Sequence, residues 1–166
     1  SWGDLAMTKY RVIIAENHTI VRDGLISILS SEPDLEIVDE IEDGIKAVKS
    51  AAKHQPDLIL MDLSMPRMNG LEATQEIRKA DPDVKILILT VHKDDEHILA
   101  ALKAGANGYV LKDARRSEFL SAIRHVLDGK YYLSPSVSEI IVSGYLDGQQ
   151  KTNSLSTWET LSLIHI

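Results

Sequence analysis

The chain has 166 residues, of which 44% are hydrophobic and 26% are charged, and its formal net charge is −7. This composition is typical of one globular domain with additional segments. The absence of cysteine excludes disulfides and thiolate chemistry. The acidic balance argues against a broad basic face for nucleic acid, and no apolar run reaches the ~20 residues of a membrane helix. We therefore expect a cytoplasmic protein without a membrane partner.

Residues 1–7 have no hydrophobic periodicity, and Met7 is placed like a native start, so we interpret this segment as a leader left by cloning. Beyond it, short apolar runs rich in β-branched residues alternate with segments whose apolar residues recur at helical spacing. The runs predict strands over residues 11–15, 35–41, 58–62, 84–90 and 108–111. The helical spacing predicts helices over residues 21–29, 45–52, 71–77, 98–102 and 119–127.

Five strands that alternate with five helices predict an α/β fold, with a parallel sheet covered on both faces by right-handed crossovers. The expected strand order is 2-1-3-4-5, the flavodoxin-like doubly wound (βα)5 arrangement. The second strand, residues 35–41, is the most alternating and acidic, which favours a place at the sheet edge. We expect this domain to occupy residues 8–132.

Polar side chains stand at the carboxyl ends of four of the predicted strands. Glu16 and Asn17 follow the first strand, Asp62 ends the third, Thr90 ends the fourth and Lys112 follows the fifth. In open α/β sheets, ligands bind in the crevice outside the carboxyl ends of the strands. We therefore expect these side chains to surround one site.

The residue types at this site suit phosphoryl transfer. Carboxylate and amide oxygens are ligands that Mg²⁺ prefers, and bound Mg²⁺ would relieve repulsion between Asp62 and an incoming phosphoryl group. Asp62 could then act as a nucleophile and form an aspartyl phosphate. Lys112 would offer a compact positive charge to the phosphoryl oxygens, and Thr90 a short hydroxyl donor. Taken singly, each residue could instead be a turn residue or a solvated group at a strand end.

Three histidines near these strand ends are interpreted as structural or surface groups. His18 stands at the start of a helix, a role that we favour over metal binding. His92 and His97 lack partners at metal-ligand spacing, so we expect them at the surface.

Several stretches of the sequence match the motifs of a known protein family. They are Ala15-Glu16-Asn17-His18, Leu60-Met61-Asp62-Leu63-Ser64-Met65-Pro66, Asn69-Gly70, Leu89-Thr90 and Gly108-Tyr109-Val110-Leu111-Lys112-Asp113. Together they resemble the receiver domain of two-component response regulators, over residues 10–132. The histidine after the two acidic-pair positions, His18, and the Gly-Tyr-Val-Leu-Lys-Asp ending are similar to the LuxR-type (NarL/FixJ) class of transcriptional regulators.

The resemblance implies that a sensor histidine kinase donates a phosphoryl group to Asp62 with the help of Mg²⁺, in a signalling domain rather than an enzyme. Ser64 would offer its backbone carbonyl to the metal. Thr90 and Lys112 would bind the phosphoryl group, and Tyr109 would be the aromatic residue whose rotamer reports it. The resemblance also leaves open a homodimer of the chain.

One position departs from the family pattern. The family usually has two acids at the end of the first strand, whereas this chain has Glu16 followed by the neutral Asn17. The lost charge should weaken Mg²⁺ binding, unless the longer Glu16 reaches the metal and compensates. Two interpretations therefore stay open, a receiver phosphorylated on Asp62 and a receiver-like interaction module that signals without phosphate. A phosphohydrolase of the haloacid dehalogenase type is a third, but Ser64 stands where such enzymes carry a general-acid aspartate.

Residues 133–154 are expected to connect the receiver to an output module. Within them, helical spacing predicts a connector helix over residues 137–145, and polar composition predicts a linker over residues 148–154. Residues 155–166 contain a Ser-x-x-Glu capping box and resemble the start of a LuxR-type helix-turn-helix. We expect a truncated output module, so that DNA would be bound only through its missing part. The alternative is an unrelated tail.

Overall fold

The computed structural model of this protein describes residues 8–151, which form six strands and six helices. The strands are β1 (Tyr10–Ala15), β2 (Leu35–Ile41), β3 (Leu58–Asp62), β4 (Lys85–Thr90), β5 (Gly108–Leu111) and β6 (Tyr132–Leu133). The helices are α2 (Thr19–Ser30), α3 (Gly44–His54), α4 (Gly70–Ala80), α5 (Asp95–Lys103), α6 (Arg116–Leu127) and α7 (Pro135–Lys151).

All strand pairs in the sheet are parallel, and the order is β2-β1-β3-β4-β5-β6. The predicted order 2-1-3-4-5 is confirmed, as is the edge position of the second strand. The sixth strand was not predicted. It pairs only Tyr132 and Leu133 with Gly108 and Tyr109, and two residues are too few to show an alternating pattern.

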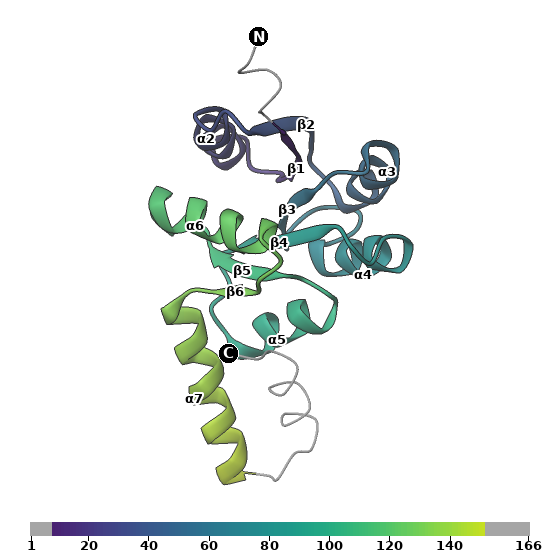
Figure 1. The fold of residues 1–166 in the computed structure, drawn as a ribbon. Helices are drawn as coiled ribbons and strands as arrows, with labels where there is room; N and C mark the ends of the chain where they lie inside the picture. The colour runs from purple at the N-terminus through teal and green to yellow at the C-terminus, as the bar shows by residue number, and fades with distance from the viewer. Residues whose placement is uncertain (1–7, 152–166) are drawn as a thin grey trace.

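Helices cover both faces of the sheet, with α2 and α6 on one face and α3, α4 and α5 on the other (Figure 1). The central strands are buried on both faces because successive side chains of a strand point in opposite directions. In β1, Ile13 packs into the core beneath α3, α4 and α5, whereas Val12 packs into the core beneath α2 and α6. Ile59 and Leu58 divide in the same way in β3. This double burial explains why these strands are continuous apolar runs in the sequence.

Capping side chains fix where α3 and α4 begin. The Asp43 carboxylate accepts a hydrogen bond from Lys46 N (2.8 Å) at the start of α3. At the start of α4, Asn69 Oδ1 accepts from Glu72 N (2.8 Å), and Asn69 N donates to Glu72 Oε1 (3.4 Å). This reciprocal pair satisfies two backbone groups that would otherwise lack partners in the first turn.

Gly70 places the start of α4 against the end of β3. Its backbone N donates to the Leu63 carbonyl (2.9 Å), and a Cβ added at Gly70 would lie 2.0 Å from the Asp62 carbonyl oxygen. A side chain here would therefore push the helix away from the strand end that carries Asp62. In the Asn69-Gly70 pair, Asn69 therefore caps α4, and Gly70 lets the start of α4 lie close to the end of β3.

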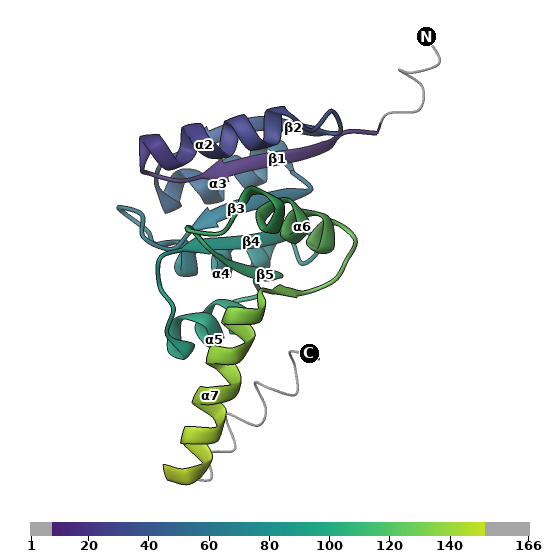
Figure 2. The same cartoon turned by 90° about the vertical axis from the view of Figure 1, so that its left-hand side faces the viewer.

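Helix α7 projects away from the sheet beside α5 (Figure 2). Val137 and Ile141 anchor its first turns in the core that also contains Ile98 of α5. A helix is present where residues 137–145 were predicted to be helical, but it is longer and runs over Pro135–Lys151, so residues 148–151 are helical rather than part of a linker. Its role as a connector stays a prediction. The predicted leader, residues 1–7, and the predicted start of a helix-turn-helix, residues 155–166, lie outside the described residues.

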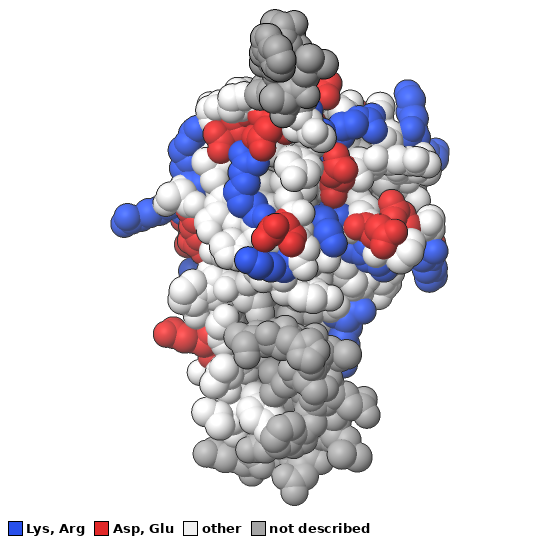
Figure 3. Space-filling model, in the orientation of Figure 1, with Lys and Arg blue, Asp and Glu red and all other residues white. Residues whose placement is uncertain are grey.

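Charges of both signs are interspersed on the surface seen in Figure 3, without one field of lysine and arginine. Within residues 8–151, none of the helices combines the length and the hydropathy that crossing a bilayer requires.

Candidate functional site

Two carboxylates are buried together at the carboxyl end of the sheet. Asp62 is the last residue of β3, and Glu16 directly follows β1. These two strands are neighbours in the sheet, with Ala15 paired to Met61, so the side chains that follow them come to the same place. Asp62 is 1% exposed and Glu16 is fully buried, which is rare for carboxylates and requires compensation.

Lys112 supplies part of that compensation. It directly follows β5, and its ammonium lies 2.6 Å from Glu16 Oε1 and 3.2 Å from Asp62 Oδ2. Its side chain is only 11% exposed, so the attraction is weakly screened by solvent. Asp62 Oδ1 also accepts a hydrogen bond from Ser64 N (3.1 Å).

The compensation is incomplete, and the charge state of Asp62 reflects this. Burial, together with the hydrogen bond and the negative charge of Glu16, raises the pKa of Asp62 to about 7, against the opposing pull of Lys112. Burial also acts to raise the pKa of Glu16, but hydrogen bonds with Asp62 and Lys112 and the Lys112 charge hold that pKa below its ordinary value. The pair therefore holds a proton more readily than two separate carboxylates would.

Asn17 faces the same carboxylate from the loop after β1. One end of its amide lies 3.2 Å from Asp62 Oδ2 and 2.9 Å from the Ser64 carbonyl oxygen. With nitrogen at that end, the amide donates a hydrogen bond to each of them. With oxygen there, three oxygens face one another, an arrangement that a cation stabilises.

These residues fit a divalent cation bound by oxygen. Both carboxylate oxygens of Glu16 are buried, and their printed neighbours are cationic or titratable groups: Oε1 lies 2.6 Å from the Lys112 ammonium and Oε2 lies 3.7 Å from His18 Nδ1. Asp62, Asn17 and the Ser64 carbonyl supply further oxygens at the same point. Oxygen ligands with room for water are the set that Mg²⁺ prefers, and added positive charge would relieve the repulsion between the two carboxylates.

Thr90 and Tyr109 belong to a hydrogen-bond chain beside this pocket. Thr90, the last residue of β4, is 1% exposed, and its Oγ1 accepts a hydrogen bond from His92 N (3.1 Å). Tyr109 of β5 is fully buried, and its hydroxyl donates to the His92 carbonyl (2.9 Å). Burial raises the pKa of the Tyr109 phenol, so it stays protonated and remains a donor. The segment after β4 is therefore held from two sides.

The structure thus brings the predicted residues together in two groups. Glu16, Asn17, Asp62, Ser64 and Lys112 meet in one pocket. Thr90 and Tyr109 meet at the connection between β4 and α5.

The predicted position of His18 at the start of a helix is confirmed, whereas the prediction for His92 and His97 needs a change. His18 precedes α2 but caps it with no side-chain hydrogen bond, and its Nδ1 lies 3.7 Å from Glu16 Oε2. The expectation that His92 and His97 lack metal-ligand partners is wrong, because both lie with Asp94 in a compact group of possible ligands. The signal in the sequence was the His-x-Asp-x-x-His spacing, in which Asp94 caps the helix that carries His97.

A parallel sheet of this order, with a buried acidic pair and a lysine at its carboxyl end, defines the receiver class of α/β domains. The model of the response regulator receiver domain family matches residues 12–124 of this chain. The chain belongs to this family, and its relatives place it in the NarL/LuxR type of response regulators.

Two curated relatives illustrate the similarity. The transcriptional regulatory protein DegU of Brevibacillus brevis is 39% identical over 137 residues, which are 82% of this chain and 58% of DegU. The oxygen regulatory protein NreC of Staphylococcus carnosus (strain TM300) is 39% identical over 155 residues, which are 92% of this chain and 71% of NreC. The chain therefore spans little more than half the length of the DegU relative.

Solved structures agree with this placement. A LuxR-family two-component response regulator from Aurantimonas sp. SI85-9A1 superposes with a TM-score of 0.80 at 33% identity, covering 84% of this chain and 99% of that one. The receiver domain of the putative response regulator NarL from Mycobacterium tuberculosis superposes with a TM-score of 0.71 at 30% identity. The match covers 74% of this chain and 99% of that one. Receivers are signalling domains that interact with sensor histidine kinases, generally bind Mg²⁺ at their acidic pocket and often dimerise.

Proposed function

We propose that Asp62 is the phosphoacceptor of this receiver and takes a phosphoryl group from the phosphohistidine of a sensor kinase. The observation that carries the proposal is the Lys112 ammonium, 3.2 Å from Asp62 Oδ2, with both side chains largely buried. A phosphoryl group on Asp62 would bring its oxygens within reach of that ammonium. The positive charge is then in place before the negative charge arrives, so little reorganisation is needed.

In the transfer, an Asp62 carboxylate oxygen attacks phosphorus as the bond from phosphorus to the donor imidazole nitrogen breaks. The bonding electrons return to that nitrogen, and the imidazole can then take up a proton. Lys112 would neutralise the phosphoryl oxygens, and the Ser64 N–H would keep Asp62 oriented through its other oxygen.

Glu16, Asp62, the Asn17 amide oxygen and the Ser64 carbonyl would hold Mg²⁺, which supplies positive charge between the carboxylates and the phosphoryl group. Thr90 would donate its hydroxyl to the phosphoryl group. Doing so would change its contact with His92 N, and the segment that Tyr109 also holds would respond.

Intact mass spectrometry after incubation with acetyl phosphate and Mg²⁺ tests the phosphoacceptor. We expect the mass to rise by one phosphoryl group in the unmodified chain and in Ser64→Ala, which keeps the backbone groups at this position. Asp62→Asn should show no gain. Equal phosphorylation of Asp62→Asn, or none in the unmodified chain, would contradict the proposal.

A receiver that signals without phosphate is the second candidate function, and Asn17 favours it. Its amide can donate to both Asp62 and the Ser64 carbonyl, which closes the pocket without a cation. Calorimetric titration with Mg²⁺ separates the two candidates. Binding in the low millimolar range or tighter supports the phosphoacceptor, and no heat of binding at higher concentrations supports the second candidate.

We further propose that this receiver controls transcription through a DNA-binding module attached beyond α7, as in a LuxR-type regulator. The DegU relative carries the name of a transcriptional regulatory protein and extends beyond the length that this chain matches. α7 would connect the switch region near α5 to that module, because Val137 and Ile141 share one core with Ile98.

A further inference from the structure

Three metal-ligating side chains come together where β4 leads into α5. One ligand atom from each of His92, Asp94 and His97 lies within 4.8 Å of the other two. His97 Nδ1 lies 2.5 Å from Asp94 Oδ2, and the His92 and His97 rings stack with centroids 4.1 Å apart and planes 2° from parallel. None of the three belongs to the acidic group around Asp62.

The helix cap explains why this spacing forms a cluster. Asp94 is the N-cap of α5, and its Oδ2 accepts a hydrogen bond from His97 N (3.1 Å). A capping side chain points at the residue three positions later, so the cap also positions the His97 ring. The Asp94 carboxylate thus contacts both the backbone N and the ring of His97, which holds the two side chains together at the start of α5.

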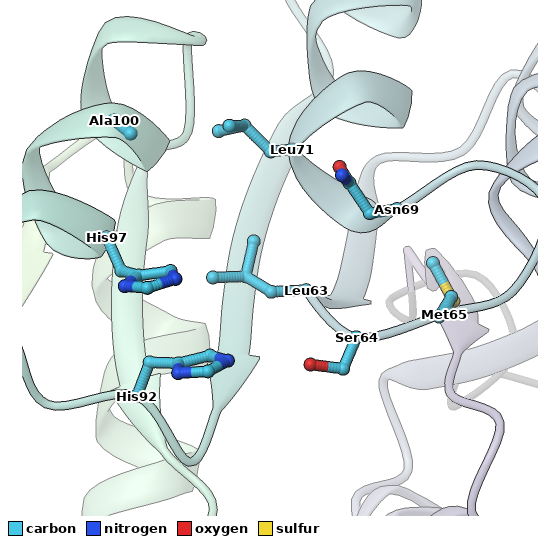
Figure 4. A pocket seen from close by; sticks show the side chains of 8 residues that line it. All are labelled: Leu63, Ser64, Met65, Asn69, Leu71, His92, His97 and Ala100. Atoms are coloured by element: carbon cyan, nitrogen blue, oxygen red, sulfur yellow. The ribbon is translucent and has the colours of Figure 1, made fainter.

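The His92 and His97 rings point into a pocket. The loop after β3 forms the opposite side of this pocket. Figure 4 shows the rings one above the other, facing Leu63 and Ser64. The pocket has a volume of about 420 Å³, and Leu71 and Ala100 also line it. It has room for an ion together with several waters, each of which takes about 30 Å³.

The chemistry of the three ligands selects the class of ion. Two imidazole nitrogens and one carboxylate oxygen suit Zn²⁺ and related transition metals, whereas Mg²⁺ prefers oxygen ligands alone. The broad torsion about the last bond of each histidine lets the rings tilt toward one ion at little cost.

We propose that His92, Asp94 and His97 form a second metal site, for a divalent transition-metal ion of the Zn²⁺ type with open positions for water. This site goes beyond the proposed function, because it would form whether or not Asp62 is phosphorylated. The metal site would also affect the proposed function through the His92 backbone. The His92 backbone is the partner of both Thr90 and Tyr109, so an ion that fixes His92 fixes the segment that those two residues hold.

Calorimetric titration of the full chain with Zn²⁺, in buffer with excess Mg²⁺, tests the site. We expect one binding event that is weakened at least about tenfold by His97→Gln and by His92→Gln. His92 uses only backbone atoms in its contacts with Thr90 and Tyr109, so its replacement leaves those bonds intact. Circular dichroism would verify that each variant is folded.

Two matched variants locate the binding. His18→Gln removes the histidine of the group formed with Glu16 and Asp62, and His125→Gln removes an exposed histidine of α6. Both should leave the Zn²⁺ affinity unchanged. Zinc affinity that is insensitive to His92→Gln and His97→Gln, or that is lost only in His18→Gln, would overturn the proposed site.

The link to the switch is read separately, by NMR. With Zn²⁺ bound, we expect the amide signals of Thr90 and Tyr109 to shift, in the unmodified chain and equally in Asp62→Asn, which cannot be phosphorylated. Unchanged signals would refute the link. A missing phosphorylation of the unmodified chain would instead refute the proposed function and leave the zinc titration to decide the metal site.

Discussion

The Lys112 ammonium lies 3.2 Å from Asp62 Oδ2, although their strands are not neighbours in the sheet. β4 lies between β3 and β5, so the lysine side chain crosses the end of the intervening strand to reach the carboxylate. Lys112 makes this contact from the position directly after β5, because its side chain is long enough to reach past β4. The contact ties the charge of the proposed phosphoacceptor to the far half of the sheet.

We expect Lys112→Met to raise the pKa of Asp62 further above about 7, because the positive charge that opposes protonation is lost. Phosphorylation by acetyl phosphate should slow by about 100-fold, the usual effect of removing one charge-stabilising donor. Carboxyl-carbon NMR titration and a time course of intact mass measure the two effects. Lys130→Met, at an exposed position, should change neither, and a lowered pKa in Lys112→Met would contradict the role of the lysine.

The stability of the metal-free chain should fall as the pH rises from about 4 to about 7. Asp62 has a pKa of about 7 in the folded chain, above its ordinary value of 3.8, so the folded state binds more protons in this window. Stability from the bound proton is therefore complete below pH 4 and lost above pH 7.

Asp62→Asn removes this dependence and should stabilise the metal-free chain at pH 8 by on the order of 2 kcal/mol. Urea unfolding with a chelator, at pH 5 and pH 8, measures the difference. Added Mg²⁺ should reduce the advantage of the variant at pH 8. If Asp62→Asn is stabilised as much at pH 5 as at pH 8, the charge of the Asp62 carboxylate is not the cause of the stabilisation.

Asn17→Asp should strengthen Mg²⁺ binding by about tenfold or more, because it adds a negative charge where the amide now faces Asp62 and the Ser64 carbonyl. Calorimetric titration measures the affinity. Gln75→Glu adds the same charge on the exposed face of α4 and should have little effect. Equal gains in both variants would point to the net charge of the chain rather than to this position.

Gly70→Ala should destabilise the chain by about 1–3 kcal/mol, because its Cβ would lie 2.0 Å from the Asp62 carbonyl oxygen and α4 would have to move. Gly24→Ala is the matched variant, since a Cβ at that position in α2 meets nothing within 4 Å. It should stabilise the chain by about 0.5–1 kcal/mol through helix propensity. Urea unfolding compares them, and the same sign in both would show that packing at Gly70 is not decisive.

The sheet was predictable because its strands carry their own signal. β1, β3 and β4 each contain an apolar run that is buried on both faces, residues 12–15, 58–61 and 86–89, and the next polar residue marks the end of each run. The same rule placed Glu16, Asp62 and Lys112 at one edge. The short β6 escaped prediction, because a two-residue strand depends on the neighbouring β5 and not on its own pattern.

The grouping of His92, Asp94 and His97 could not be predicted from strand ends. It depends on how the cap of α5 turns the chain, and on a ring stack that brings a loop residue against the first helical turn. The orientation of Tyr109 is of the same kind. Its sequence position fixes the strand, whereas its inward hydroxyl is fixed by the His92 carbonyl.

The amino-acid sequence by itself determined the strand order and the identity of the residues at the carboxyl edge of the sheet, because these follow from local hydrophobic patterns and a fixed chain topology. The receiver class came instead from the resemblance of its motifs to that family. Only the tertiary structure decided the charge state of the acidic pair and the partners of the histidines. Those depend on burial and on distances of a few ångströms between residues far apart in the chain, and no local pattern encodes them.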